Sequence, residues 1–422
     1  KEEWRYMPSD FWPMQRQLFN NRQDTHMYGL DGKPVVWACD QFDDGSIDQG
    51  TRNISPTSGA GSQTCESSSE DFVRVITSTR RGGGDHGFIY ALDLSPTKNI
   101  TDDATGQITP KFMWRISGGG STGDFTRLGQ TWSDPKIATI MVNPGAPHAK
   151  DVLIFGGGYD PKLDDSNVFS TGDNDGSDFL GNAIYIVNPM NGEKMLSISG
   201  KGTGADIEVD DMHFSIPSAI SILDSNSDGQ VDRLYVGDLG GQVWRVDLAQ
   251  ALPLTGNRAG GDGFGTVVGK LADVSSNTTG ERRRFFSPPS VVQVKDTAFS
   301  ETEEYDYVLM GSGDRPHPLS VTEKDKFYAF RDRFIAENSL KDSNKDHVCG
   351  DGDSYPKSNH KPITHADAAS LINATTKGLK DHDADSVKSS DGYFFDFAEA
   401  NSGKPGEKAL SAPLTVGGAV AF

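Results

Sequence analysis

Short runs of apolar residues, separated by clusters of glycine, aspartate, asparagine and serine, recur along most of the chain. Such runs, bounded by turn residues, are typical of β-strands. They include residues 72–77, 87–94, 152–155, 234–237 and 307–310. A different pattern occupies residues 10–19, where Pro13 stands in the first turn of a predicted short helix. We therefore expect a nearly all-β chain with one helix in an N-terminal leading segment, residues 1–38.

One strand ending returns five times, as an aromatic residue followed within a few positions by aspartate or asparagine. The five copies begin at Tyr90, Tyr185, Trp244, Tyr328 and Tyr393. Their spacing is too uneven for a solenoid, but it fits a ring of stacked sheets with loops of variable length. We predict an all-β, modified β-propeller of about six or seven blades, with long loop insertions, as a single domain over residues 1–422. The aromatic side chains should lie between adjacent blades.

An acidic loop stands between two of the predicted strands. Asp224, Asn226, Asp228 and Asp232 occupy the first, third, fifth and ninth positions of residues 224–232, and Gln230 stands at the seventh. Ca²⁺ binds several oxygen ligands, and alternate residues of a tightly curled loop point inward. We predict that the four side chains and the backbone carbonyl of Gln230 bind calcium between two strands of a sheet.

Two alternatives to a calcium loop exist for residues 224–232. An EF-hand has a glutamate at the twelfth position and a helix on each side, whereas Tyr235 stands there and both flanks are strand-like. A polar turn without an ion is the plainer interpretation, but three carboxylates crowded into one loop repel one another unless a cation lies between them. Residues 40–48, 173–176 and 342–346 depart further from the pattern, and we interpret them as solvated loops and turns.

Composition excludes several partners. The chain has 60 acidic and 40 basic residues and a net charge of -20, which opposes binding to nucleic acid or to an anionic membrane surface. It has no apolar run long enough to span a membrane. The three cysteines, Cys39, Cys65 and Cys349, lack the paired spacing of a zinc or thioredoxin-like site.

Catalytic motifs are absent from the sequence, so we assign no catalytic residue and predict that the protein is not an enzyme. It contains no zinc-protease motif, nucleophile elbow, Walker loop, kinase set or dinucleotide fingerprint. The blade endings are similar to those of quinoprotein dehydrogenases, which hold calcium and grip the quinone with adjacent cysteines. This chain has no such cysteine pair.

Four segments together resemble one family. They are residues 128–135, residues 152–160, the calcium loop with residues 238–248, and residues 311–318. In order and spacing they are similar to the C-terminal domain of the PilC/PilY type IV pilus tip proteins, over roughly residues 30 to 420. The resemblance implies a modified β-propeller at the pilus tip, extracellular or on the outer-membrane surface. It also implies roles in pilus assembly, in calcium-dependent control of extension and retraction, and in surface adhesion.

On this resemblance the expected partners are minor pilins or pilin subunits, together with a host or surface receptor. Two alternatives remain open: a periplasmic quinoprotein-like enzyme and a carbohydrate-binding propeller. The extracytoplasmic setting also leads us to expect a disulfide between Cys39 and Cys65, which would close a polar loop.

Overall fold

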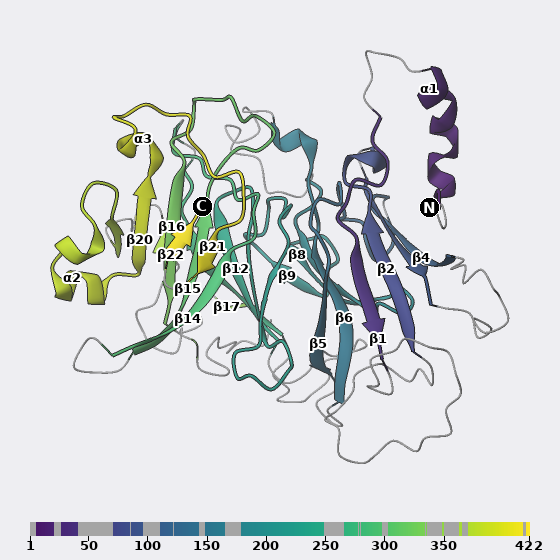
Figure 1. Cartoon of the computed structure of the whole chain (residues 1–422), viewed down its shortest axis with the longest axis horizontal. Helices are drawn as coiled ribbons and strands as arrows, with labels where there is room; N and C mark the ends of the chain where they lie inside the picture. Colours follow the sequence, from purple (N-terminus) through teal and green to yellow (C-terminus); the bar gives the residue numbers. More distant parts are fainter. Residues whose placement is uncertain are drawn as a thin grey trace.

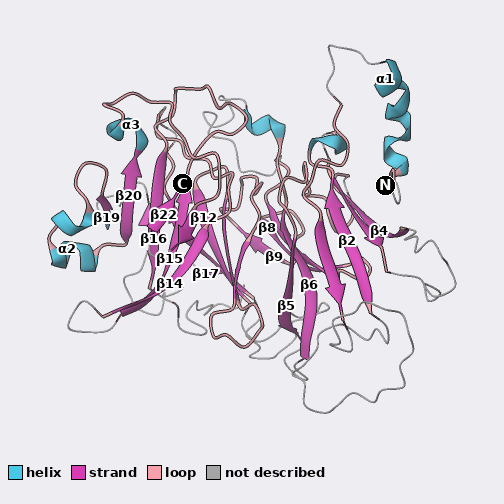
Figure 2. Ribbon diagram, viewed as in Figure 1, coloured by secondary structure: helices cyan, strands magenta, loops and turns pink. Residues whose placement is uncertain are grey.

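The computed structural model describes residues 6–20, 27–40, 71–84, 86–95, 110–120, 122–142, 148–164, 179–248, 266–276, 278, 280–297, 303–333, 335, 348–349, 363–364, 370–416 and 419–422. The described chain is nearly all β-structure, with a few short helices at its periphery (Figure 2). The leading segment contains a 3₁₀-helix, η1 (Ser9–Met14), which includes Pro13, and then α1 (Gln15–Asn20). The predicted short helix is therefore confirmed, although its first half is a 3₁₀-helix.

The first and second sheets are antiparallel meanders, in which strands adjacent in sequence pair with each other. The first sheet consists of β1 (Val35–Cys39), β2 (Phe72–Ser78), β3 (Phe88–Asp93) and β4 (Lys111–Ser117). The second consists of β5 (Lys136–Val142), β6 (His148–Gly156), β7 (Ala183–Val187), β8 (Lys194–Gly200) and the parallel strand β9 (Ile207–Val209).

The third and fourth sheets repeat the same plan. The third contains β10 (Ser221–Leu223), β11 (Arg233–Gly237), β12 (Gln242–Asp247) and β13 (Val267–Asp273), and two short parallel strands, β17 (Val348–Cys349) and β18 (Ile363–Thr364), pair with β13. The fourth contains β14 (Ser290–Asp296), β15 (Glu303–Gly311), β16 (Lys326–Asp332), β20 (Gly392–Asp396) and the parallel strand β19 (Leu371–Asn373). Two short helices, α2 (Ala384–Ser389) and α3 (Phe397–Ala400), flank β20, and a final hairpin, β21 (Leu414–Val416) and β22 (Ala419–Ala421), contacts β14.

The four sheets follow one another along the long axis of the molecule, with the first near α1 and the fourth at the opposite end (Figure 1). A separate cluster of buried apolar side chains fills each space between neighbouring sheets. On β11, for example, Leu234 and Val236 belong to the cluster shared with the second sheet, whereas Tyr235 belongs to the cluster shared with the fourth. Because side chains alternate along a strand, one strand supplies both interfaces. This arrangement is β-propeller-like, as the sequence predicted.

The predicted number of blades needs correction. The described residues form four sheets and one hairpin, not six or seven blades. The repeats at Tyr328 and Tyr393 were counted as two blades, but they lie on paired strands of one sheet, where Tyr328 faces Phe394 and Ala329 faces Tyr393. The last strands of the chain, β21 and β22, form a two-stranded hairpin and not a full blade.

Three of the five repeat aromatics lie between sheets, as expected. Tyr185, Trp244 and Tyr328 are each buried in a different intersheet cluster. Tyr90 instead donates a hydrogen bond to Asp10 of η1 at 2.8 Å, so it joins the first sheet to the leading segment. Tyr393 is only half-buried on the fourth sheet.

Cys39 ends β1, is buried and takes part in a disulfide. Its predicted partner, Cys65, lies outside the described residues. The acidic stretches at 173–176 and 342–346, and all of 40–48 except Asp40, lie outside them as well.

Candidate functional site

The predicted calcium loop connects β10 to β11, which pair directly in the third sheet. Its curl depends on two residues with positive φ, Ser227 at +63° and Gly229 at +87°. A Cβ at Gly229 would meet no atom within 4 Å, so backbone conformation, not space, explains the glycine. The expectation of a tightly turned loop between two strands is confirmed.

Three of the predicted ligands are joined by hydrogen bonds inside the loop. The carboxylate of Asp224 accepts from the backbone N–H of Asp228 at 3.1 Å and of Gly229 at 2.8 Å. The side chain of Asn226 accepts from the N–H of Asp228 at 3.0 Å and donates to the Asp228 carboxylate at 3.2 Å. Asp228 in turn accepts from the N–H of Gln230 at 2.8 Å. The first, third and fifth positions therefore share one side of the turn.

Asp232 has a different set of partners. Its carboxylate accepts from the N–H of Ser225 at 3.1 and 3.2 Å and from the Ser225 hydroxyl at 2.7 Å, which closes the base of the loop. Burial raises the pKa of Asp232; the Asp224 carboxylate also raises it, while Ser225 and Arg233 lower it. A cation beside Asp232 would oppose that rise by favouring the ionised form.

The donor chemistry fits a hard cation, because every predicted ligand offers oxygen. The side-chain Oε1 of Gln230 is also buried without a hydrogen-bond partner, and such an oxygen is one that an ion or a water would satisfy. Within the described ranges, however, no three His, Cys, Asp or Glu side chains converge as a metal centre. The ligands are thus neighbours in one loop, held by its own amides.

A buried network of charges begins at the next residue, Arg233. Its guanidinium donates to Asp247 at 3.1 Å, to Asp306 of β15 at 3.0 Å and to the carbonyl of Ile335 at 3.0 Å. Tyr235, two residues along β11, donates to Asp306 at 3.1 Å and to Asp332 at 2.8 Å. These contacts cross from the third sheet to the fourth, so the loop leads directly into an intersheet contact.

Arg245 of β12 completes this network. It donates to Asp247 at 2.8 and 2.6 Å and to Asp332 at 2.9 Å. Both arginines and all three aspartates are buried. Burial raises the pKa of Asp306, whose Oδ1 has no hydrogen-bond partner, and Arg233 lowers it. Burial lowers the pKa of Arg245, but the carboxylates of Asp247 and Asp332 raise it well above its ordinary value. The arginines therefore stay charged where desolvation is strongest.

The sequence reasoning missed this network. Arg245 and Asp247 stand in the repeat ending of β12, where neighbouring positions are apolar. The pattern therefore predicts a strand there and gives these two residues no separate role. A buried charge network could have been inferred from charged residues at alternate positions of strands that are otherwise apolar on both faces. Such residues are buried only when they are paired.

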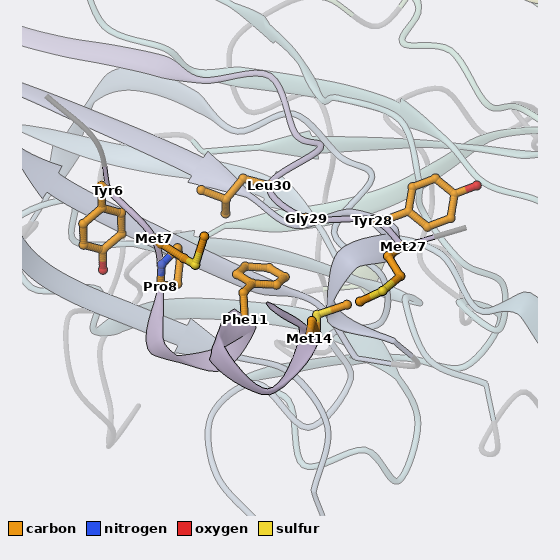
Figure 3. A pocket seen from close by; sticks show the side chains of 9 residues that line it. All are labelled: Tyr6, Met7, Pro8, Phe11, Met14, Met27, Tyr28, Gly29 and Leu30. Carbon is orange, nitrogen blue, oxygen red and sulfur yellow. The ribbon is translucent and has the colours of Figure 1, made fainter. Parts of the chain in front are cut away.

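A separate apolar cavity of about 290 Å³ lies in the leading segment. Met7, Phe11, Met14, Met27 and Leu30 are among its lining side chains, and Figure 3 shows them gathered around one opening beside η1. Most of the described side chains that line it are apolar, so this cavity offers packing surface.

None of the helices within the described ranges has the length and apolar character that a membrane crossing requires.

The stacked four- to six-stranded sheets define the chain as a β-propeller-like protein. Among solved structures, the crystal structure of the Pseudomonas aeruginosa PilY1 C-terminal domain is similar to it, with a TM-score of 0.55 and 15% sequence identity. The likeness covers 100% of this chain and 71% of that chain, and at this identity it concerns the fold. No family model and no curated protein sequence matches.

Proposed function

We propose that this protein is a calcium-binding component of a type IV pilus, located at the pilus tip on the cell exterior. The observation that carries the proposal is the likeness of the fold over the whole chain to the PilY1 C-terminal domain. The loop at 224–232, with its oxygen ligands between two paired strands, supports the calcium part. The proposed roles are pilus assembly, calcium-dependent control of extension and retraction, and adhesion, with pilins and a surface receptor as partners. No catalytic residue belongs to the proposal.

Asp224, Asn226, Asp228 and Asp232, with the Gln230 carbonyl, would hold the ion. The ion supplies positive charge that neutralises carboxylates in one short loop. Asp224 already orients two loop amides, and Asp232 ties the base of the loop to Ser225. Because Arg233 follows directly and reaches Asp306, ordering of the loop stabilises the contact between the third and fourth sheets. Calcium acts in this proposal as a conformational latch.

The calcium part is tested by Asp228→Ala. Asp228 links Asn226 to Gln230, and its removal takes away a ligand at the centre of the turn. We expect calorimetry to show one calcium site in the wild type and at least a hundredfold weaker binding in the variant. Calcium at a hundred times its Kd should stabilise the wild type by about 2.7 kcal/mol. Asp210→Ala serves as the control, because Asp210 is an exposed acid paired with Lys201. Equal calcium affinity in wild type and Asp228→Ala would refute the site.

The pilus part is tested separately, by deleting the gene in its host and counting surface pili. We expect fewer pili, restoration by the wild-type gene, and co-purification of the protein with pilin subunits. Normal piliation in the deletion strain, with no pilin in the purified material, would refute this part whatever the calcium result.

A further inference from the structure

A cavity of about 730 Å³ lies where the four sheets approach one another. The segments that lead into the first strand of every sheet contribute to its wall, and so does the segment before the final hairpin. They are residues 33–36, 134–137, 217–219, 286–288 and 410–412. In a propeller, the space enclosed by the starts of the blades is the central channel. The cavity occupies the corresponding place in this fold, so we call it the axial cavity, and no residue of the calcium loop lines it.

The wall of this axial cavity is cationic, although the whole chain carries a net charge of -20. Lys33, Arg80, Lys136 and Arg315 line it, against one carboxylate, Asp134. Asp134 is engaged by Arg80 at 3.1 Å. Within the described part of the chain, Lys33, Lys136 and Arg315 form no ion pair. A concave site of one sign focuses its field on ligands of the opposite sign.

Arg80 is held in the cavity wall by a strained backbone. Its φ is +46° and its ψ is -114°, a backbone conformation that residues other than glycine rarely adopt. Its N–H donates to the hydroxyl of Thr131 at 3.0 Å, which fixes this position. The Nε of Arg80 is buried and has no hydrogen-bond partner. Backbone strain of this kind clusters at functional sites, so it supports a binding role for this wall.

Ser218 is a second polar group in the wall without a partner. It is 2% exposed, and its hydroxyl makes no hydrogen bond. A buried hydroxyl normally finds a partner, so an unsatisfied one in a cavity wall calls for a polar ligand atom.

The remaining wall is apolar and partly aliphatic. Val36 and Leu410 are 62% and 48% exposed, which is unusual for large apolar side chains that line a cavity. Trp132 also lines it, but its ring already packs on Tyr159 at 4.9 Å and beneath the Arg81 guanidinium at 4.9 Å. An aliphatic side chain therefore fits this wall better than a sugar ring, which needs a free aromatic face.

We propose that the axial cavity binds a short extended peptide that carries acidic side chains next to an aliphatic one. The carboxylates lie against Arg80, Lys136 and Arg315, and the aliphatic side chain contacts Val36 and Leu410. The volume falls within the range of about 300–1,000 Å³ in which proteins enclose compact ligands, and it exceeds the need of a single small anion. This site does not depend on the pilus assignment or on calcium.

The test is calorimetric titration of the whole chain with an acetylated tripeptide amide of aspartate, leucine and glutamate. Parallel titrations use the asparagine–leucine–glutamine tripeptide, galacturonic acid and inorganic phosphate. We expect the acidic tripeptide to bind at least tenfold more tightly than each of the others, and more weakly as salt rises, because salt screens exposed charges.

The double variant Lys136→Gln with Arg315→Gln changes two exposed side chains, so it should fold normally. It should bind the acidic tripeptide at least tenfold more weakly and with less dependence on salt. Lys380→Gln, in an exposed turn outside the cavity wall, should bind as the wild type does. Absence of tripeptide binding at millimolar concentration, or unchanged affinity in the double variant, would overturn the site. Equal binding of phosphate or galacturonic acid would overturn its assignment to a peptide.

Discussion

Asp238 is a carboxyl group that the fold removes completely from water. It stands in the turn between β11 and β12, is 0% exposed, and accepts hydrogen bonds from Gly240 N, Gln242 N and Trp244 Nε1, each at 2.9 Å. Burial raises the pKa of Asp238 to about 7, although these donors favour the ionised form. The turn therefore holds a proton that the unfolded chain releases near pH 4.

This difference makes stability depend on pH at a single residue. Between about pH 4 and pH 7 the folded protein binds a proton at Asp238 that the unfolded chain does not. The stability that protonated Asp238 contributes is therefore complete below about pH 4 and is lost as pH rises toward 7. We expect the free energy of unfolding of the wild type to contain a falling component of up to about 1.4 kcal/mol per pH unit in this window. Asp238→Asn should remove that component, as measured by urea unfolding with a chelator at several pH values.

The readout is the pH slope, because the asparagine also changes hydrogen bonds and lowers stability at every pH. Asp210→Asn, at an exposed position, should keep the wild-type slope. If Asp238→Asn retains the wild-type slope between pH 4 and pH 7, Asp238 is ionised in the folded state.

Residue spacing predicted the tight turn at 224–232, and local geometry explains why. Short polar side chains at alternate positions, together with Gly229, specify a tight turn. The alternation and the glycine are both properties of residues adjacent in sequence. The orientation of Asp232 toward Ser225 and the burial of Asp238 depend on what packs over them, and no local pattern records it.

At the scale of elements, the packing of β11 and β12 of the third sheet against β15 and β16 of the fourth depends on a charge cluster as well as on apolar contacts. Arg245→Met should leave Asp247 with Arg233 as its guanidinium partner and should deprive buried Asp332 of the Arg245 guanidinium, which costs about 3–5 kcal/mol. Thermal or denaturant unfolding measures the loss.

A second variant separates this explanation from simple loss of packing. Adding Asp332→Leu to Arg245→Met also removes the buried carboxylate with which Arg245 pairs, so the double variant should lose less stability than the two single variants lose in sum. Lys201→Gln, which breaks an exposed ion pair with Asp210, should leave the unfolding curve unchanged. Additive losses in the double variant would mean that Arg245 and Asp332 are not coupled.

The strands of these sheets show what sequence patterns can and cannot predict. Apolar runs bounded by glycine turns located β2, β3, β6, β11 and β15, because alternation and turn chemistry are local, but they did not locate β4, β5, β8, β13 or β14. Which strands pair with each other depends on residues far apart in the sequence. The repeat at Tyr393 therefore suggests a blade of its own, although its strand β20 pairs with β16. The sequence does distinguish the Tyr393 repeat from the other four, because no apolar run followed by a glycine-rich turn precedes it.

At the scale of the whole molecule, the sheets share their cores in sequence. One apolar cluster joins the first and second sheets, another the second and third, and a third the third and fourth. No sheet can expose its faces without also exposing those of a neighbour. We expect residues 1–422 to behave as a single domain with one cooperative thermal transition, in which the calorimetric and van't Hoff enthalpies agree. Two resolved transitions in the calorimeter would show that the chain contains independent units.

The short parallel strands have a consequence for the behaviour of the protein at high concentration. β13 and β20 end their meanders with backbone groups that could pair with another chain, and an exposed strand edge of this kind promotes aggregation. β17, β18 and β19 pair with these two edges, and all three come from the long insertion between β16 and β20, residues 333–391. Each is only two or three residues long, too short to act as a template in its turn. The length of that insertion is therefore constrained by colloidal stability, because shortening it would uncover two sheets at once.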